Sequence, residues 1–398
     1  MSIPAANEGP PFAPDRIDTQ AVLDGILSWV AIETPSHRPD QIARLLDLAE
    51  AAVADLPIER RRIPGRDGLG DHVVLHYDPA GQGGPVALAM GHVDTVWKVG
   101  TLDERPIRQE GDRIHGPGIY DMKAGTYLAF WALAEIARAG IVPPRPITVL
   151  LNSDEEIGSP TSRALIEELA GNAAFVMVPE PAIGPEVAAV TSRKGWGRFT
   201  VTAHGVPAHA GANHARGRSA IREIARQILA LEEMTDYDSG TTLNVGVVSG
   251  GTLLNVVPAE ARIEVDLRVA DAVQAEAMER RLLGLAATDP DVRLTVEGGF
   301  NRPPFVRDEK VLRLHAAARE LAQGMGFDLP EAHRGGVSDG NFTAAMGRPT
   351  LDGLGCGGDG AHAVFEHITR SSIAPRAALM AGMMGSAAFQ RAALATED

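Results

Sequence analysis

Three consecutive acids, Asp154, Glu155 and Glu156, follow the apolar segment 147–151 after two intervening polar residues. Short apolar and β-branched runs bounded by turn residues are typical of strands, so we expect the acids at a strand end. Three neighbouring carboxylates repel one another unless a positive charge lies among them. A solvated acidic turn would be the better interpretation of this run alone. Metal binding becomes the stronger hypothesis because four other segments also end in metal-ligand residue types.

The four other segments carry His92 with Asp94, then Asp121, Glu180 and His362. His92 and Asp94 are two residues apart, so in an extended chain they lie on the same side. His92 can bind a metal through its imidazole, and Asp94 can hold that ring by accepting its second N–H. Taken alone, the pair is more often a hydrogen-bonded histidine beside a helix-capping acid. Asp121, before a predicted helix, fits an N-cap as well as a carboxylate that bridges two metals.

Strands and helices alternate through the part of the chain that carries most of these residues. Strands are expected at 73–77, 86–90, 147–151 and 174–178, and helices within 20–55 and at 126–139 and 161–169. Continuous apolar strands belong in a parallel sheet covered on both faces, and open α/β sheets bind ligands outside the carboxyl ends of their strands. The acids lie at those ends. We therefore predict an α/β fold with a mixed, mostly parallel sheet flanked by helices.

A different pattern begins near residue 194. Alternating apolar and polar residues, typical of antiparallel strands with one solvated face, occur at 198–204, 243–248, 261–269 and 292–296. An amphipathic helix is expected at 219–233. After residue 303 the chain returns to helices and one strand. We predict a first domain of residues 1–193 and 304–398, and an inserted α+β domain of residues 194–303.

Composition restricts the class of protein further. With 398 residues and 44% hydrophobic content the chain can bury two cores, and its net charge of -15 argues against nucleic-acid or anionic-membrane partners. Residues 1–19 lack the basic start and apolar core of a signal peptide, and no apolar run approaches the ~20 residues of a membrane helix. A single cysteine, Cys356, excludes an internal disulfide and a cysteine-rich zinc site. We expect a cytoplasmic protein.

A glycine-rich stretch precedes His362. Gly355, Gly357 and Gly360 match the G-x-G-x-x-G pattern of dinucleotide-binding loops. Such a site also needs a following helix and an acid about 20 residues on, and residues 375–385 contain no acid. We interpret the stretch as a flexible loop that presents His362.

Each motif alone is weak, but their order and spacing together resemble the di-zinc family of aminoacylases and carboxypeptidases. That family includes acetylornithine deacetylase, succinyl-diaminopimelate desuccinylase and the bacterial folate-cleaving glutamate carboxypeptidase. The resemblance covers nearly the whole chain, and the motifs at 91–96, 116–123 and 154–159 are most similar to the glutamate carboxypeptidase branch. It implies an exopeptidase-like zinc-binding domain and an inserted lid that forms a homodimer through residues 194–303.

The resemblance implies two zinc sites that share one carboxylate, with Co²⁺ or Mn²⁺ as possible substitutes. The ligands would be His92 and Glu180 for one ion, Glu156 and His362 for the other, and Asp121 for both. The charges agree, because three carboxylates and a bridging hydroxide cancel the four positive charges of two Zn²⁺. These are ordinary zinc ligands, and an open position is typical of a catalytic site. The family also has a cis peptide after its bridging aspartate, here the Asp121–Met122 bond.

The same resemblance leaves Glu155 uncoordinated beside the metals as the general base. The zinc ions lower the pKa of the bound water toward ~7, so a carboxylate can remove its proton at neutral pH. The hydroxide would attack an amide carbonyl, and Glu155 would pass the proton to the departing nitrogen. Asp94 would hold His92. Glu155 and Glu156 are adjacent, so only the resemblance assigns the base to the first and metal binding to the second.

The inserted domain would contribute a further histidine. His209, in the segment 208–211, resembles a family histidine that reaches into the partner subunit's site and stabilises the oxyanion. A histidine on a surface loop is the alternative. The chain departs from the family pattern nearby, with His214 and Ser219 where proline and asparagine are usual.

Three more positions resemble those that grip a substrate carboxylate, namely Asn255, Arg268 and Gly336. Arginine suits this task because its fork binds a carboxylate through two hydrogen bonds, although a surface salt bridge is the alternative for Arg268. We expect glutamate-carboxypeptidase-like, zinc-dependent hydrolysis of an amide bond to an α-amino acid with a free carboxylate, in a small peptide or N-acyl amino acid. An N-acyl amino acid deacylase of the acetylornithine deacetylase or desuccinylase type is the first alternative. A non-catalytic binding protein on the same fold is the second, marked by loss of a ligand or of the base.

Overall fold

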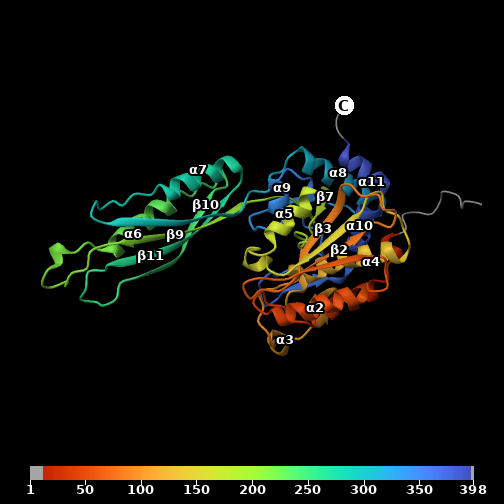
Figure 1. Cartoon of the computed structure of the whole chain (residues 1–398), viewed down its shortest axis with the longest axis horizontal. Coiled ribbons are helices and arrows are strands. Elements are labelled where there is room, and N and C mark those ends of the chain that lie inside the picture. The colour runs from red at the N-terminus through yellow and green to blue at the C-terminus, as the bar shows by residue number, and fades with distance from the viewer. Residues whose placement is uncertain (1–11, 396–398) are drawn as a thin grey trace, which may run out of the picture. The chain divides into compact units, whose positions relative to one another are not determined.

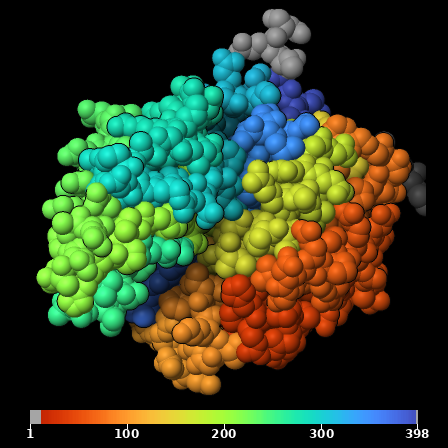
Figure 2. Space-filling view, turned by 60° about the vertical axis from the view of Figure 1, so that its left-hand side comes forward, coloured from red at the N-terminus to blue at the C-terminus, as the bar shows by residue number. Residues whose placement is uncertain are grey.

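The structure, a computed structural model, describes residues 12–395 as two compact units. The major unit runs from the first described residue to Thr191 and takes in Arg307–His333 and the chain from Ser338 onward. The minor unit consists of Ser192–Val306 and Arg334–Val337. Both halves of the chain therefore contribute to the major unit, whose red-to-yellow and blue surfaces are visible in Figure 2. The sequence-based division had placed the segment 334–337, which contains Gly336, in the first domain.

The major unit is built on a six-stranded sheet in the order β1-β2-β6-β3-β7-β14, of which Figure 1 labels β2, β3 and β7. Its strands are β1 (Glu59–Ile63), β2 (His72–Tyr77), β3 (Val86–His92), β6 (Ile147–Asn152), β7 (Ala173–Met177) and β14 (Thr350–Leu351). The pairings β6–β3, β3–β7 and β7–β14 are parallel, whereas β1–β2 and β2–β6 are antiparallel. The predicted mixed, mostly parallel sheet is confirmed.

Helices cover both faces of this sheet. Every residue of β3 is buried, with Ala87 and Ala89 in the core of one face and Leu88 and Met90 in that of the other. The first face packs against α2 (Pro39–Ala52), α4 (Ala124–Arg138), α8 (Glu309–Gly324), α10 (Ile373–Gly385) and α11 (Ala387–Leu394), and the second against α5 (Arg163–Gly171) and α9 (Gly340–Ala345). Burial on both sides explains why these strands are continuously apolar.

A small antiparallel sheet joins two segments that are distant in sequence. Its strands, in order, are β15 (Gly358–Asp359), β16 (His367–Thr369), β5 (Arg113–His115) and β4 (Arg108–Glu110). Because His367 pairs with His115, the chain after His362 lies beside the chain that leads to Asp121. No sequence pattern predicted these short strands.

The minor unit is an antiparallel sheet with two helices on one face. Its strands, in order, are β10 (Thr242–Gly250), β11 (Glu260–Val269), β9 (Gly195–His204) and β12 (Arg293–Arg302). The alternating pattern is confirmed in β9, where Phe199, Val201 and Ala203 enter the core and the residues between them do not. The expected helix is α6 (Ala220–Glu232), capped by Ser219, whereas α7 (Ala272–Leu283) was not predicted.

The N-terminal segment in which no signal peptide was expected lies partly outside the described residues, which begin at Phe12. Between residues 12 and 395, none of the helices combines the length and the apolar character that crossing a membrane requires.

Candidate metal centre

The carboxyl ends of three neighbouring strands bring together residues that the sequence singled out. The strands β6, β3 and β7 run parallel, so their carboxyl ends meet at one edge of the sheet. His92 is the last residue of β3. Glu155 and Glu156 begin the turn after β6, and Glu180 follows the end of β7 by three residues.

Asp121 and His362 come to the same edge from irregular segments. Asp121 lies in the turn before α4, and its peptide bond to Met122 is cis, as the resemblance predicted. His362 lies in the loop between β15 and β16 with φ of 60°, in the left-handed region that non-glycine residues rarely occupy. Such conformations persist where the surroundings fix the residue, and they cluster at functional sites.

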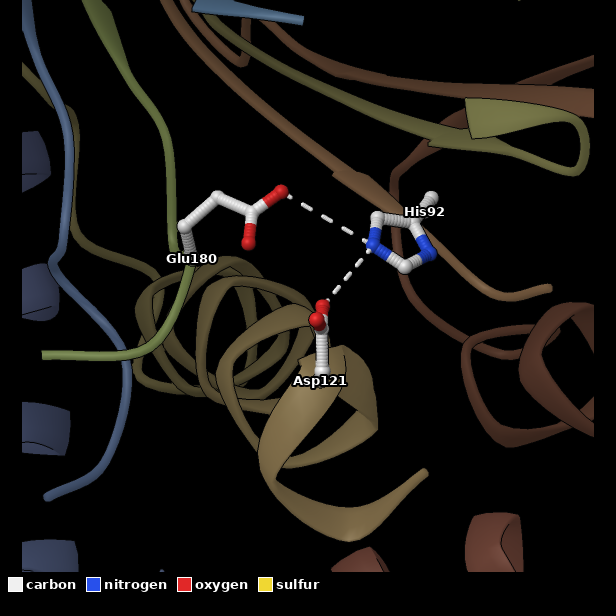
Figure 3. A group of neighbouring side chains, drawn as sticks. All are labelled: His92, Asp121 and Glu180. Carbon is white, nitrogen blue, oxygen red and sulfur yellow. Dashed lines mark ion pairs between the residues drawn. The ribbon is translucent and has the colours of Figure 1, made fainter. Parts of the chain in front are cut away.

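Two triads of ligand-type side chains share the carboxylate of Asp121. In the first, His92 Nε2 lies 3.4 Å from Asp121 Oδ1 and 3.7 Å from Glu180 Oε1, and Figure 3 shows the three side chains pointing toward one another. In the second, His362 Nε2 lies 3.3 Å from Asp121 Oδ2 and 3.1 Å from Glu156 Oε2. Within each triad the ligand atoms lie within 4.8 Å of one another. Asp121 thus offers one oxygen to each of the two triads.

The donor set fits divalent zinc. His92 Nε2 and Glu156 Oε1 are buried and have no hydrogen-bond partner among the described residues, which is costly unless something else binds them. Imidazole nitrogen and carboxylate oxygen are both ordinary zinc ligands. Three carboxylates at one sheet edge also require compensating positive charge. The residues present therefore fit two zinc ions.

Neighbouring carboxylates raise the pKa of both histidines at the centre, His92 and His362. Burial opposes a charged His92, yet the nearby carboxylates of Asp121, Asp94 and Glu180 raise its pKa well above the usual value. Hydrogen bonds to Asp121 and Glu156 raise the pKa of His362 to about 10. The carboxylates thus attract protons to the two imidazoles, and metal ions binding at the same nitrogens would displace those protons.

Asp94 is fully buried and contacts more than His92. The Nδ1 atom of His92 lies 2.9 Å from the backbone carbonyl oxygen of Asp94 and 3.4 Å from its carboxylate. The sequence predicted that the carboxylate would hold the ring, but the backbone carbonyl is the closer acceptor. The carboxylate accepts the backbone N–H of Glu155 and of Glu156, each at 3.2 Å, and the hydroxyl of Ser36 at 2.6 Å. Asp94 therefore orients the histidine and the acidic turn together.

Asp154, to which the sequence assigned no role, is a structural acceptor. Its carboxylate is fully buried and accepts the backbone N–H and the hydroxyl of both Thr161 and Ser162 at 2.5 to 3.2 Å. These residues lead into α5, so Asp154 fixes the chain after the turn to the turn itself. The three consecutive acids thus have separate environments.

Sequence reasoning missed two buried ionisable residues beside the centre. Glu366 is 3% exposed and accepts four N–H groups from residues 97–121, and burial raises its pKa to about 7. Lys123 is 1% exposed and donates from Nζ to the carbonyl of Ile32, and burial lowers its pKa to about 7. The only sequence feature that could have indicated them is position, since Glu366 lies four residues after His362 and Lys123 two residues after Asp121.

The remaining candidates belong to the minor unit. His209 is exposed, and its Nδ1 accepts the backbone N–H groups of Gly211 and Ala212, each at 3.1 Å, so the neutral ring carries its proton on Nε2. The carbonyl of Asn255 accepts the N–H of Ala210 at 2.9 Å, which holds the loops bearing His209 and Asn255 side by side.

Arg268 and Gly336 have partners of their own within the minor unit. Arg268 forms a two-bond contact with Asp266 at 2.8 and 3.0 Å, the salt bridge that the sequence had left open as its alternative. Its guanidinium also lies over the ring of Trp196 at 5.3 Å. The carbonyl of Gly336 accepts from Arg193 at 3.2 Å.

The chain thus has a mostly parallel α/β sheet with two triads of metal-ligand side chains at its carboxyl edge, which is where such sheets bind their ligands. The chain belongs to peptidase family M20/M25/M40, whose family model matches residues 88–386. It is therefore a metallohydrolase, and the fold and family inferred from its motifs are confirmed.

The similarity to individual proteins extends over most of the chain. It is 31% identical to carboxypeptidase G2 of Pseudomonas sp. (strain RS-16) over 371 residues, which cover 92% of this chain and 88% of that one. Acetylornithine deacetylase of Myxococcus xanthus is 32% identical over 63% of this chain and 68% of its own length. The crystal structure of aminopeptidase PepT from Bacillus cereus superposes with a TM-score of 0.73 at 22% identity, covering 92% of this chain and 98% of that one, and supports the fold.

Proposed function

We propose that this chain hydrolyses the amide bond between an acyl or peptidyl group and an α-amino acid with a free carboxylate, as a glutamate-carboxypeptidase-like zinc enzyme. The observation that carries the proposal is the pair of triads that share Asp121, with a further carboxylate, Glu155, one residue before the ligand Glu156. The similarity to carboxypeptidase G2 over 92% of this chain favours this substrate class.

The residues of the major unit would divide the work. His92 and Glu180 would hold one zinc ion, Glu156 and His362 the other, and Asp121 both. Two bound zinc ions would polarise the amide carbonyl and make a water molecule acidic near neutral pH. Glu155 would accept the proton of that water and deliver it to the departing nitrogen. Asp94 supports both steps, because its carboxylate fixes the backbone of Glu155 and of Glu156.

The minor unit would recognise the substrate. His209 would act in the site of the partner subunit. Its Nε2–H would be left to donate to the developing oxyanion there, because Nδ1 is occupied by two backbone N–H groups. Asn255, Arg268 and Gly336 would bind the substrate carboxylate. Arg268 would exchange its two-bond contact with Asp266 for an equivalent contact with that carboxylate, so little hydrogen bonding would be lost.

A homodimer through the minor unit is part of the proposal, as is a cytoplasmic location, which fits the single cysteine. The strand β10 is an edge of its sheet, and its Val247 and Val248 are 53% and 63% exposed. Apolar edge strands favour pairing with another chain. Val248→Glu should shift sedimentation toward the monomer, whereas Val273→Glu, at a valine on α7 that is 78% exposed, should not. A monomeric wild-type protein would refute the dimer.

A panel of N-acyl amino acids, assayed with and without a chelator, tests the function. N-aroyl and peptidyl glutamates should be hydrolysed fastest, and chelation should abolish turnover that zinc then restores. Faster release of acetate from N-acetylornithine would instead favour the deacylase alternative, which the Myxococcus xanthus relative supports. Activity in a metal-free sample would refute the mechanism. Tight binding of every substrate without turnover would indicate a non-catalytic binding protein.

A further inference from the structure

Glu366 belongs to neither triad, but it contacts several segments that carry ligand candidates. It lies four residues after His362, and its side chain is almost completely buried. Burying a carboxylate is costly unless donors surround it, so the identity of those donors indicates its purpose.

The donors to Glu366 lie in the turn that carries Asp121 and in the segment that follows His92. Its Oε1 accepts the backbone N–H of Tyr120 at 2.9 Å and of Asp121 at 3.1 Å. Its Oε2 accepts the backbone N–H of Gly118 at 2.9 Å and the indole N–H of Trp97 at 2.6 Å. Three backbone contacts along one turn fix the main chain of the shared ligand Asp121.

The fourth donor extends this anchoring to the segment after His92. Trp97 follows His92 by five residues, so its contact with Glu366 ties that loop to the turn of Asp121. The two loops pack tightly, because a Cβ at Gly118, whose φ is 71°, would lie 2.4 Å from Cγ2 of Thr95. The backbone N–H of Glu366 in turn donates to the carbonyl of Ala363, one residue after His362.

We propose that Glu366 is a positioning residue for both metal ions, acting through the segments that carry His92, Asp121 and His362. The inference rests on the proposed zinc-dependent function. Asp121 divides its two oxygens between the triads at 3.4 and 3.3 Å, so a small shift of its main chain changes both sites at once. A glutamate that only stabilised its loops would change the stability of the protein without changing metal affinity.

The substitution Glu366→Gln separates these roles, because it keeps the shape and turns one acceptor oxygen into a donor that faces N–H groups. Zinc affinity is measured on the metal-free protein by competition with a chromophoric chelator, together with kcat, KM and the thermal midpoint. Partners that orient ligands typically contribute about 10- to 100-fold in metal affinity or activity. We expect a loss of that size in zinc affinity and in kcat, with little change in KM.

Glu223→Gln is the matched control. Glu223 is also buried, at 1% exposed, and accepts the backbone N–H groups of Thr288 and Asp289 at 2.8 and 3.2 Å, but it lies in the minor unit. It should lower the thermal midpoint and leave zinc affinity unchanged. Wild-type zinc affinity in Glu366→Gln, or an equal loss in Glu223→Gln, would overturn the proposal.

A milder variant keeps the test decisive if Glu366→Gln fails to fold. Trp97→Phe removes one of the four donors and should weaken zinc binding several-fold; unchanged binding would count against the proposal. Failure of the proposed function gives a different result, in which the wild-type protein binds zinc but hydrolyses no amide while Glu366→Gln still loses affinity.

Discussion

The two units hold their candidate functional residues in different ways. In the major unit, His92 and Glu180 are 1% and 7% exposed, and buried acceptors such as Asp94 fix the segments around them. In the minor unit, His209 and Asn255 are exposed on loops joined by backbone hydrogen bonds. Rigid, buried groups suit metal chemistry that tolerates little displacement, and exposed loops suit contacts that differ between substrates. Variants of the major unit should therefore change metal content or kcat, and those of the minor unit should leave metal content intact.

The largest effect is expected in the acidic turn of the major unit. Glu155→Gln should lower kcat about 10²- to 10⁴-fold with both zinc ions retained, because it removes the proton acceptor and no ligand. Glu156→Gln, one residue on, should instead lose zinc, since it removes a ligand oxygen. Elemental analysis beside steady-state kinetics measures both. If Glu155→Gln lost zinc and Glu156→Gln retained it, the roles of base and metal ligand, which the family resemblance assigns, would have to be exchanged.

The next effect tests whether the minor unit takes part in the chemistry. His209→Ala should lower kcat about 10²- to 10³-fold through loss of an oxyanion donor, with zinc affinity unchanged. His214→Ala, at another exposed histidine five residues on, is the control and should behave like the wild type. Equal kinetics for the two variants would remove His209 from the mechanism.

A smaller effect concerns the recognition of the substrate carboxylate. Arg268→Lys should raise KM about tenfold with kcat little changed, because an ammonium group cannot reproduce the planar two-bond contact. Arg262→Lys is matched to it, since Arg262 lies on the same strand and also pairs with an acid two residues away, Glu264, at 2.9 Å. A KM shift common to both would show that the strand, and not the guanidinium of Arg268, is responsible.

The smallest effect is on the acid stability of the major unit. A hydrogen bond from Arg307 lowers the pKa of Glu331 to about 2, from its ordinary value of 4.5. The folded state therefore binds this proton less readily than the unfolded state, so the pair stabilises the protein above pH 4.5 and the contribution is lost as the pH falls toward 2. Glu331→Gln should lower the free energy of unfolding by about 1 kcal/mol at pH 7 and by less at pH 3. Chemical denaturation at both values measures this, with exposed Glu320→Gln expected to show no such difference.

The sheet and the ligand candidates could be predicted because both depend on residue patterns that are local in the sequence. Continuous apolar strands followed by His92, Glu156 or Glu180 place those residues at one edge of a parallel sheet. The role of Asp154 was not predictable, since it depends on the orientation of a turn and not on residue type. Glu366 was missed because its donors lie 245 to 269 residues away along the chain. Such contacts are determined by tertiary packing alone.

The insertion of the minor unit has a consequence for the order in which the chain folds on the ribosome. Nearly all of the minor unit is one continuous segment, Ser192–Val306. The core of the major unit, by contrast, packs Val73 and Leu75 of the first half of the chain with Leu314 and Met380 from its last quarter. The apolar face of the early strands, which α2 and α4 also cover, is therefore completed only after α8 and α10 have been synthesised. All but a short segment of the minor unit is therefore synthesised before the chain that completes the major unit, so Ser192–Val306 can begin to fold first.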